Sequence, residues 1–93
     1  MKRVRPALGP EHEQAYYRRV GLLIREIREG QGMGRYEFGK AVGLSRWTLI
    51  NYEEGVRPSG HHPAVPMHIV DRVCSFVGMP VAQFYRRLSR FQG

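Results

Sequence analysis

The stretch from Gly32 to Gly55 constrains what this chain can fold into more than any other part of the sequence. Two short amphipathic segments meet within it at Val42-Gly43-Leu44-Ser45. Glycine adopts the left-handed conformation that ends many helices, and serine is a preferred cap at the start of a helix. The turn therefore predicts helices over residues 35–42 and 46–54, joined as a helix-turn-helix, with Ser45 as the cap of the second helix and Gly55 as its stop.

The rest of the chain also reads as helical. Apolar residues recur at intervals of three and four, and no alternating strand pattern is present. Pro10 suits the start of a first helix that ends at the glycines of residues 30–34, and Gly78 separates helices near 67–77 and 80–91. We expect an all-α fold of five helices, whose inward faces carry Tyr16, Val20, Leu23, Ile24 and Ile27, then Phe38, Ala41 and Val42, then Leu49 and Tyr52, then Val70, Val73, Cys74 and Val77, and finally Val81, Phe84, Tyr85 and Leu88.

Length and charge indicate one small basic domain. The chain has 93 residues, so we expect a single domain over residues 10–91, preceded by a basic arm of residues 1–9 with Lys2, Arg3 and Arg5. That arm could reach DNA or be an ordinary solvated terminus. Lys and Arg number 15 against 8 Asp and Glu, with a pI near 10.3. Such a balance favours nucleic acid as a partner, although a merely basic protein remains the alternative.

Several classes of protein are disfavoured. Cys74 is the only cysteine, so we expect a buried thiol in a reducing compartment. No secretion signal or transmembrane run is visible, which predicts a cytoplasmic protein without membrane contact. His61, His62 and His68 lack a recognised metal-binding spacing, so neither a metal nor a cofactor is expected. The chain also lacks a nucleophile and base, a carboxylate pair or a phosphate-binding loop, which argues against an enzyme with a small-molecule substrate.

Over residues 20–85 the chain resembles the Xre/Cro group of lambda-repressor-like helix-turn-helix proteins. The positions that carry this resemblance are Ile24, Arg28, Phe38, Gly43, Ser45, Leu49, Glu53 and Gly55, together with Val77-Gly78-Met79 and Phe84. The resemblance implies a compact five-helix lambda-repressor-like domain that binds double-stranded DNA. It further implies a sequence-specific transcriptional regulator, expected to be a dimeric repressor with its third helix in the major groove.

The resemblance also assigns site residues. Its base-reading positions fall on Arg46, Trp47 and Asn51, and arginine, an apolar side chain and asparagine can recognise guanine, the thymine methyl group and adenine respectively. A solvated face is the alternative for Arg46 and Asn51, and a core-packing role is the alternative for Trp47. Contacts with the DNA backbone are expected from Arg35, Ser45, Thr48, Lys40 and Arg57. A structural ion pair is implied between Arg28 and Glu53.

The sequence differs from the family pattern at three positions. Arg35 replaces a glutamine that is common in the family, Gly34 replaces a serine or threonine cap, and Gly39 replaces a small alanine between the two motif helices.

The apolar stripe of the last helix is longer than a small core needs. Its end either forms a dimer surface or folds back on the first helix, and it also supports a second hypothesis, a protein-interaction module resembling an antitoxin. The surface consists of Tyr85, Leu88 and Phe91.

Overall fold

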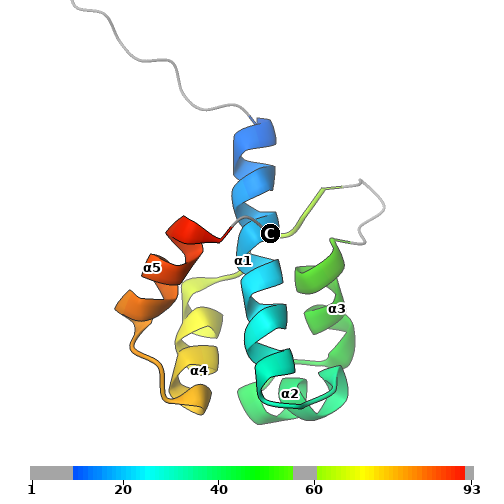
Figure 1. Ribbon diagram of the computed structural model, residues 1–93. Helices are drawn as coiled ribbons and strands as arrows, with labels where there is room; N and C mark the ends of the chain where they lie inside the picture. Colours follow the sequence, from blue (N-terminus) through cyan, green and yellow to red (C-terminus); the bar gives the residue numbers. More distant parts are fainter. Residues whose placement is uncertain (1–9, 56–60, 92–93) are drawn as a thin grey trace, which may run out of the picture.

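The computed structural model describes residues 10–55 and 61–91 and contains five helices (Figure 1). The arm residues Lys2, Arg3 and Arg5, and also Arg57, lie outside the described residues. No strand occurs in the described part of the chain, which confirms the all-α prediction. The helices are α1 (Pro10–Gly30), α2 (Arg35–Val42), α3 (Arg46–Glu54), α4 (Met67–Val77) and α5 (Val81–Arg90).

Helix α1 is the central element of the arrangement. Figure 1 shows α3 on one side of it, α4 and α5 on the other, and α2 across the bottom, where it joins the two sides. The first turns of α1 project above the other helices in this view. Among residues 10–55 and 61–91, none of the helices combines the length and the apolar character that crossing a bilayer requires.

The turn between α2 and α3 has the predicted local structure. Gly43 is left-handed, with φ of 77°, and Gly55 ends α3 in the same conformation, with φ of 64°. The Ser45 hydroxyl accepts a hydrogen bond from the backbone N–H of Thr48 at 3.0 Å, so it satisfies one of the free amides at the start of α3. These caps confirm both boundaries of the turn.

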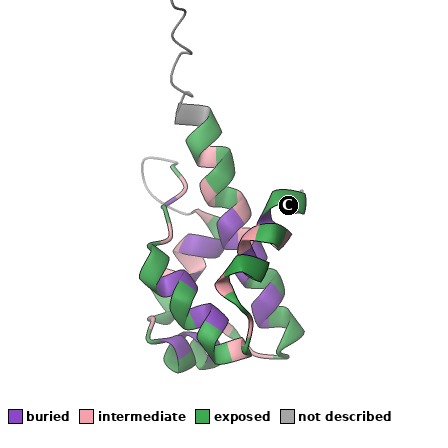
Figure 2. Ribbon diagram, turned by 90° about the vertical axis from the view of Figure 1, so that its left-hand side faces the viewer, coloured by how far each residue is buried: buried purple, intermediate pink, exposed green. Residues whose placement is uncertain are grey.

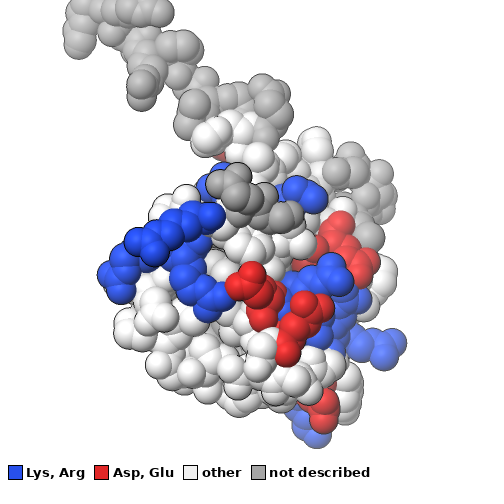
Figure 3. All heavy atoms as spheres, viewed as in Figure 1, with Lys and Arg blue, Asp and Glu red and all other residues white. Residues whose placement is uncertain are grey.

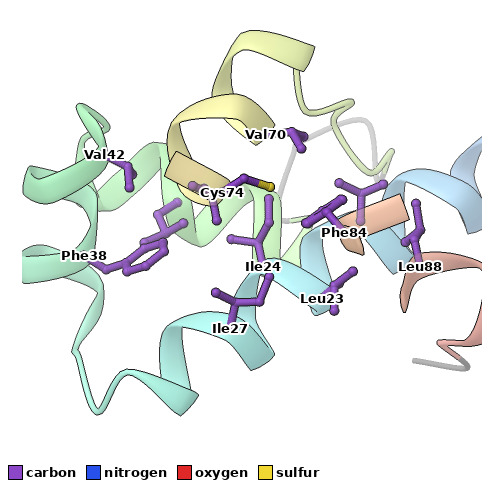
Figure 4. Close-up of a cluster of buried hydrophobic side chains, with 12 residues drawn as sticks. Leu23, Ile24, Ile27, Phe38, Val42, Val70, Cys74, Phe84 and Leu88 are labelled. Atoms are coloured by element: carbon purple, nitrogen blue, oxygen red, sulfur yellow. The ribbon is translucent and has the colours of Figure 1, made fainter. Parts of the chain in front are cut away.

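All five helices contribute to one buried cluster. Figure 2 shows buried and exposed residues alternating along the helices. Phe38 of α2 packs near Val42 beside Ile27 of α1, while Phe84 of α5 lies near Leu23 (Figure 4). Cys74 is buried there as predicted, and burial, together with the nearby Asp71 carboxylate, raises the pKa of its thiol. The buried apolar residues are Val20, Leu23, Ile24, Ile27, Phe38, Val42, Leu49, Tyr52, Ile69, Val70, Val73, Cys74, Phe84 and Leu88.

Two expected inward positions are exposed, Tyr16 and Ala41. Val77, Val81 and Tyr85 are half-buried and pack against the core cluster. Ile69, which was not predicted, is buried.

The apolar end of α5 belongs to the core of this same chain. Leu88 is 3% exposed, and the half-buried Tyr85 and Phe91 pack against the core cluster. An ion pair between Arg87 and Glu26 also joins α5 to α1, at 2.5 Å. Placing Leu88 on a dimer surface was therefore wrong: the structure shows the alternative, in which this end folds back within the chain.

Gly39 allows α2 to approach the turn that follows it. A Cβ atom at this position would lie 2.6 Å from the Leu44 carbonyl oxygen, a backbone atom that cannot move aside without displacing the turn. Gly30 at the end of α1 has open space at the corresponding position. The two glycines therefore provide a matched pair for substitution.

We expect Gly39→Ala to destabilise the fold by about 1–3 kcal/mol, because it forces apart a closely packed contact. Gly30→Ala should be neutral or stabilising by up to about 1 kcal/mol, since alanine favours helix and meets no neighbour. Urea unfolding followed by circular dichroism would measure both. Similar midpoints for the two variants would contradict the close approach at Gly39.

Candidate nucleic-acid interface

The last turn of α3 is held by a buried charge cluster of Arg28, Arg35 and Glu53. Glu53 is 2% exposed and receives hydrogen bonds from Arg28 Nε at 2.9 Å and Arg28 Nη2 at 3.0 Å. Arg28 also donates to the Met33 carbonyl oxygen at 2.8 Å. The structure thus brings the implied Arg28–Glu53 pair together and satisfies most of its polar groups, which a buried ion pair requires.

Arg35 is the third member of this cluster. Its Nε donates to Glu53 Oε1 at 2.9 Å, and its Nη2 donates to Glu54 Oε2 at 2.5 Å. Burial disfavours the charged guanidinium, but the hydrogen bonds to Glu54 and Glu53 outweigh it and raise the pKa of Arg35. Two carboxylates hold the Nε and Nη2 donors of Arg35, and its expected contact with the DNA backbone stays a prediction. The adjacent glutamates at 53–54 were the sequence signal for this arrangement.

The first turn of α3 is exposed, in contrast to the buried Tyr52 and Glu53 in its last turn. Arg46 is exposed, and Trp47 is 63% exposed although tryptophan is the largest apolar side chain. The core-packing alternative for Trp47 is therefore wrong. Arg46, Trp47 and Asn51 together form what we call the α3 face.

Asn51 is the most restricted member of the α3 face. It is half-buried, and its Oδ1 atom is buried without a hydrogen-bond donor. The two-bond contact with adenine that was expected needs both the oxygen and the nitrogen of the amide. In this conformation only the nitrogen remains for a partner.

The expected backbone-contacting residues differ in their surroundings. The hydroxyl of Ser45 donates to the hydroxyl of Thr48 at 2.9 Å, so these two side chains are linked to each other. Lys40 is exposed, and its Nζ lies 5.9 Å from the ring centroid of Tyr36. Sequence reasoning missed Tyr36, which is 64% exposed; an aromatic residue in the first turn of α2 was the available signal.

A shallow hollow separates the N-terminal ends of α2 and α3. Its volume is about 420 Å³, and its lining includes Arg46 and Tyr36. The complete lining is Gly34, Arg35, Tyr36, Glu37, Arg46 and Ile50. The hollow therefore adjoins the exposed beginning of α3, and its lining includes the phenol of Tyr36 and the guanidinium of Arg46, for which the described residues supply no carboxylate.

Charges elsewhere are distributed unevenly. Basic side chains gather over α5 on the left of the face shown in Figure 3, while acidic and basic side chains alternate toward its middle and right. Arg25 and Glu29, one turn apart on α1, pair at 3.2 Å. Within the ranges that the structure describes, no group of three or more histidine, cysteine or acidic side chains could hold a metal ion.

Comparison with known proteins gives results that agree with this geometry. Residues 24–62 match a family model described as helix-turn-helix. A protein of Thermococcus kodakarensis named "Putative HTH-type transcriptional regulatory protein TK0539" is 42% identical over 50 residues, which are 54% of this chain and 16% of the relative. A similarly named protein of Thermococcus gammatolerans is 30% identical over 78 residues, 84% of this chain and 23% of the relative. The chain thus spans less than a quarter of the length of either relative.

We expect Glu53→Ala to destabilise the fold by about 3–5 kcal/mol, because it leaves the buried Arg28 guanidinium without its carboxylate. Glu54→Ala removes a solvent-exposed partner of Arg35, so it should cost no more than about 1 kcal/mol. Thermal unfolding at neutral pH measures both losses. Equal losses would show that burial of the cluster is not what makes Glu53 important.

Proposed function

We propose that the protein is a sequence-specific regulator that binds double-stranded DNA, because residues 24–62 match a helix-turn-helix family model and the same region resembles the Xre/lambda-repressor-like proteins. The observation that carries the proposal is the contrast along α3. Its last turn is fixed in the core through Glu53, while Arg46 and Trp47 at its beginning are exposed. Such a helix can present side chains to DNA without losing its support.

In the proposed complex α3 enters the major groove and α2 crosses above it against the DNA backbone. This arrangement directs the hollow between the two helix beginnings toward the duplex. Lys40 and Tyr36, both exposed on α2, can then approach phosphate groups. The basic character of the whole chain adds a sequence-independent attraction that weakens with salt.

The α3 face suggests which base groups are read. The guanidinium of Arg46, which has no carboxylate partner among the described residues, can donate to O6 and N7 of guanine. The exposed ring of Trp47 can contact a thymine methyl group. Asn51 can donate one hydrogen bond through its amide nitrogen, for instance to a purine N7.

We further propose that the protein acts as a dimeric repressor. Three reading side chains specify only a few base pairs, and two copies on adjacent half-sites would double that number. The half-sites would then lie about 34 Å apart, one helical turn of DNA. Light scattering on the complex with a selected duplex measures the stoichiometry, and one copy per duplex at saturation would contradict the dimer.

The proposal is tested first by selecting bound duplexes from a random pool. We expect a recurring sequence that binds at least about 1000-fold more tightly than a scrambled duplex at physiological salt. Fluorescence anisotropy measures both affinities. A pool that shows no enrichment after several rounds, with the protein folded, would overturn the function.

We expect Arg46→Ala to lose about 1–3 kcal/mol of discrimination at one base position of the selected duplex. Lys40→Ala should instead weaken binding to all duplexes alike and reduce the salt dependence by about one phosphate contact. Binding titrations at several salt concentrations separate the two effects. Uniform losses from both variants would contradict the assignment of Arg46 as a base reader.

The contact proposed for Trp47 can be tested from the DNA side. Replacing thymine by uracil removes only the methyl group, so it should weaken binding of the natural chain at the position that Trp47 contacts. The same replacement should have no effect on Trp47→Ala, which should keep its stability within about 0.5 kcal/mol because the side chain is exposed. Equal sensitivity of both proteins to uracil would exclude the methyl contact.

A further inference from the structure

His62 makes contacts that the proposed DNA interface does not use. His62 lies between α1 and the end of α3, where its Nε2 is 2.7 Å from the Tyr52 carbonyl oxygen. A carbonyl oxygen can only accept, so Nε2 carries the proton in this contact. The backbone N–H of His62 donates to the side chain of Gln14 on α1. The histidine therefore connects both helices.

Two glycines provide the space that the His62 ring fills. A Cβ atom at Gly55 would lie 2.4 Å from His62 Nδ1. A Cβ atom at Gly21 of α1 would lie 1.7 Å from the Tyr52 carbonyl oxygen and 3.1 Å from His62 Nε2. The backbone of α1, the last turn of α3 and the imidazole thus meet at one closely packed point.

The contact with His62 supplies a hydrogen-bond donor to a carbonyl group in the last turn of α3. The last four carbonyl groups of a helix have no partner within it. Asn51 O receives the Gly55 N–H at 2.8 Å, and Tyr52 O receives the His62 ring. His62 therefore acts as a side-chain cap supplied by a residue outside the helix.

Two separate points on α1 hold consecutive residues of α3. On α1, the backbone of Gly21 lies against the Tyr52 carbonyl group that His62 also contacts, and Arg28 binds Glu53. Seven residues separate Gly21 from Arg28, which is about 10 Å along α1. One contact alone would fix the position of the last turn of α3, whereas two contacts also fix its direction.

We propose that His62 is a positioning residue for DNA recognition, which sets the angle at which α3 crosses α1; this inference rests on the function proposed above. Arg46 lies six residues before Tyr52, or about 9 Å along α3. A rotation of about 10° at the last turn moves Arg46 by about 1.5 Å. Binding sites need their groups within about 0.5 Å, so loss of the angle reduces specificity.

The proposal differs from two other roles of a histidine at this place. A direct contact between His62 and one base would affect recognition at that base alone. A general stabilising role would lower the fraction of folded protein and weaken binding to all duplexes alike. Positioning instead relaxes recognition at the positions read by Arg46 and Trp47 together, while non-specific binding is retained.

The experiment compares His62→Ala, His62→Gln and the control His12→Ala, which removes an exposed histidine of α1. The measured quantity is the affinity for the selected duplex divided by that for a scrambled duplex, on protein shown to be folded. We expect His62→Ala to lower this ratio by about tenfold, with the loss divided between the base positions read by Arg46 and Trp47, as duplexes changed at one position at a time would show. His62→Gln keeps an N–H donor and should restore much of it, and His12→Ala should leave it unchanged.

A second measurement needs no DNA. His62→Ala should accelerate hydrogen exchange at the Gly55 amide, which belongs to the last turn of α3. If His62→Ala fails to fold, Gln14→Ala takes its place, because it releases the His62 backbone and leaves α3 intact. An unchanged specificity ratio, a loss at one base position only, or no restoration by glutamine would overturn the positioning role. If the natural chain itself prefers no duplex, it is the proposed function that fails.

Discussion

The charge cluster around Glu53 is the interaction on which the rest of the molecule depends. One buried carboxylate accepts hydrogen bonds from arginines of α1 and α2 while it belongs to α3. A buried carboxylate without such partners would be strongly unfavourable, so arrangements of the three helices that separate Glu53 from both arginines are disfavoured. The core could tolerate other apolar residues of similar volume, but a charge that needs several donors cannot be satisfied by an approximate fit.

The two ends of helix α3 consequently differ: its last turn is held in the core, and its first turn is exposed to solvent. Its last turn carries Tyr52 and Glu53, which are buried and bound to α1, and its first turn carries Arg46 and Trp47, which are exposed. Precision at the exposed end depends on contacts made at the buried end. In a chain of 93 residues, few side chains are available for each purpose.

Local signals made much of this structure predictable from sequence. The helix boundaries follow from Gly43, Ser45 and Gly55, whose preferences act within a few residues. The contacts of Arg35 and His62 depend on how helices distant in sequence approach one another, so local patterns do not specify them. The same limit explains why Leu88 was placed on a surface: an apolar stripe shows that a face is covered, but not whether the cover belongs to the same chain.

The position of Trp47 has a practical consequence for observing this protein. It is the single tryptophan of the chain, and it lies on the exposed beginning of α3 rather than in the core. Indole emission should therefore change little when the core forms, yet respond strongly when a ligand covers α3. The chain thus contains its own optical reporter of occupancy, spectrally separable from the tyrosines, five in number, that are spread through the sequence.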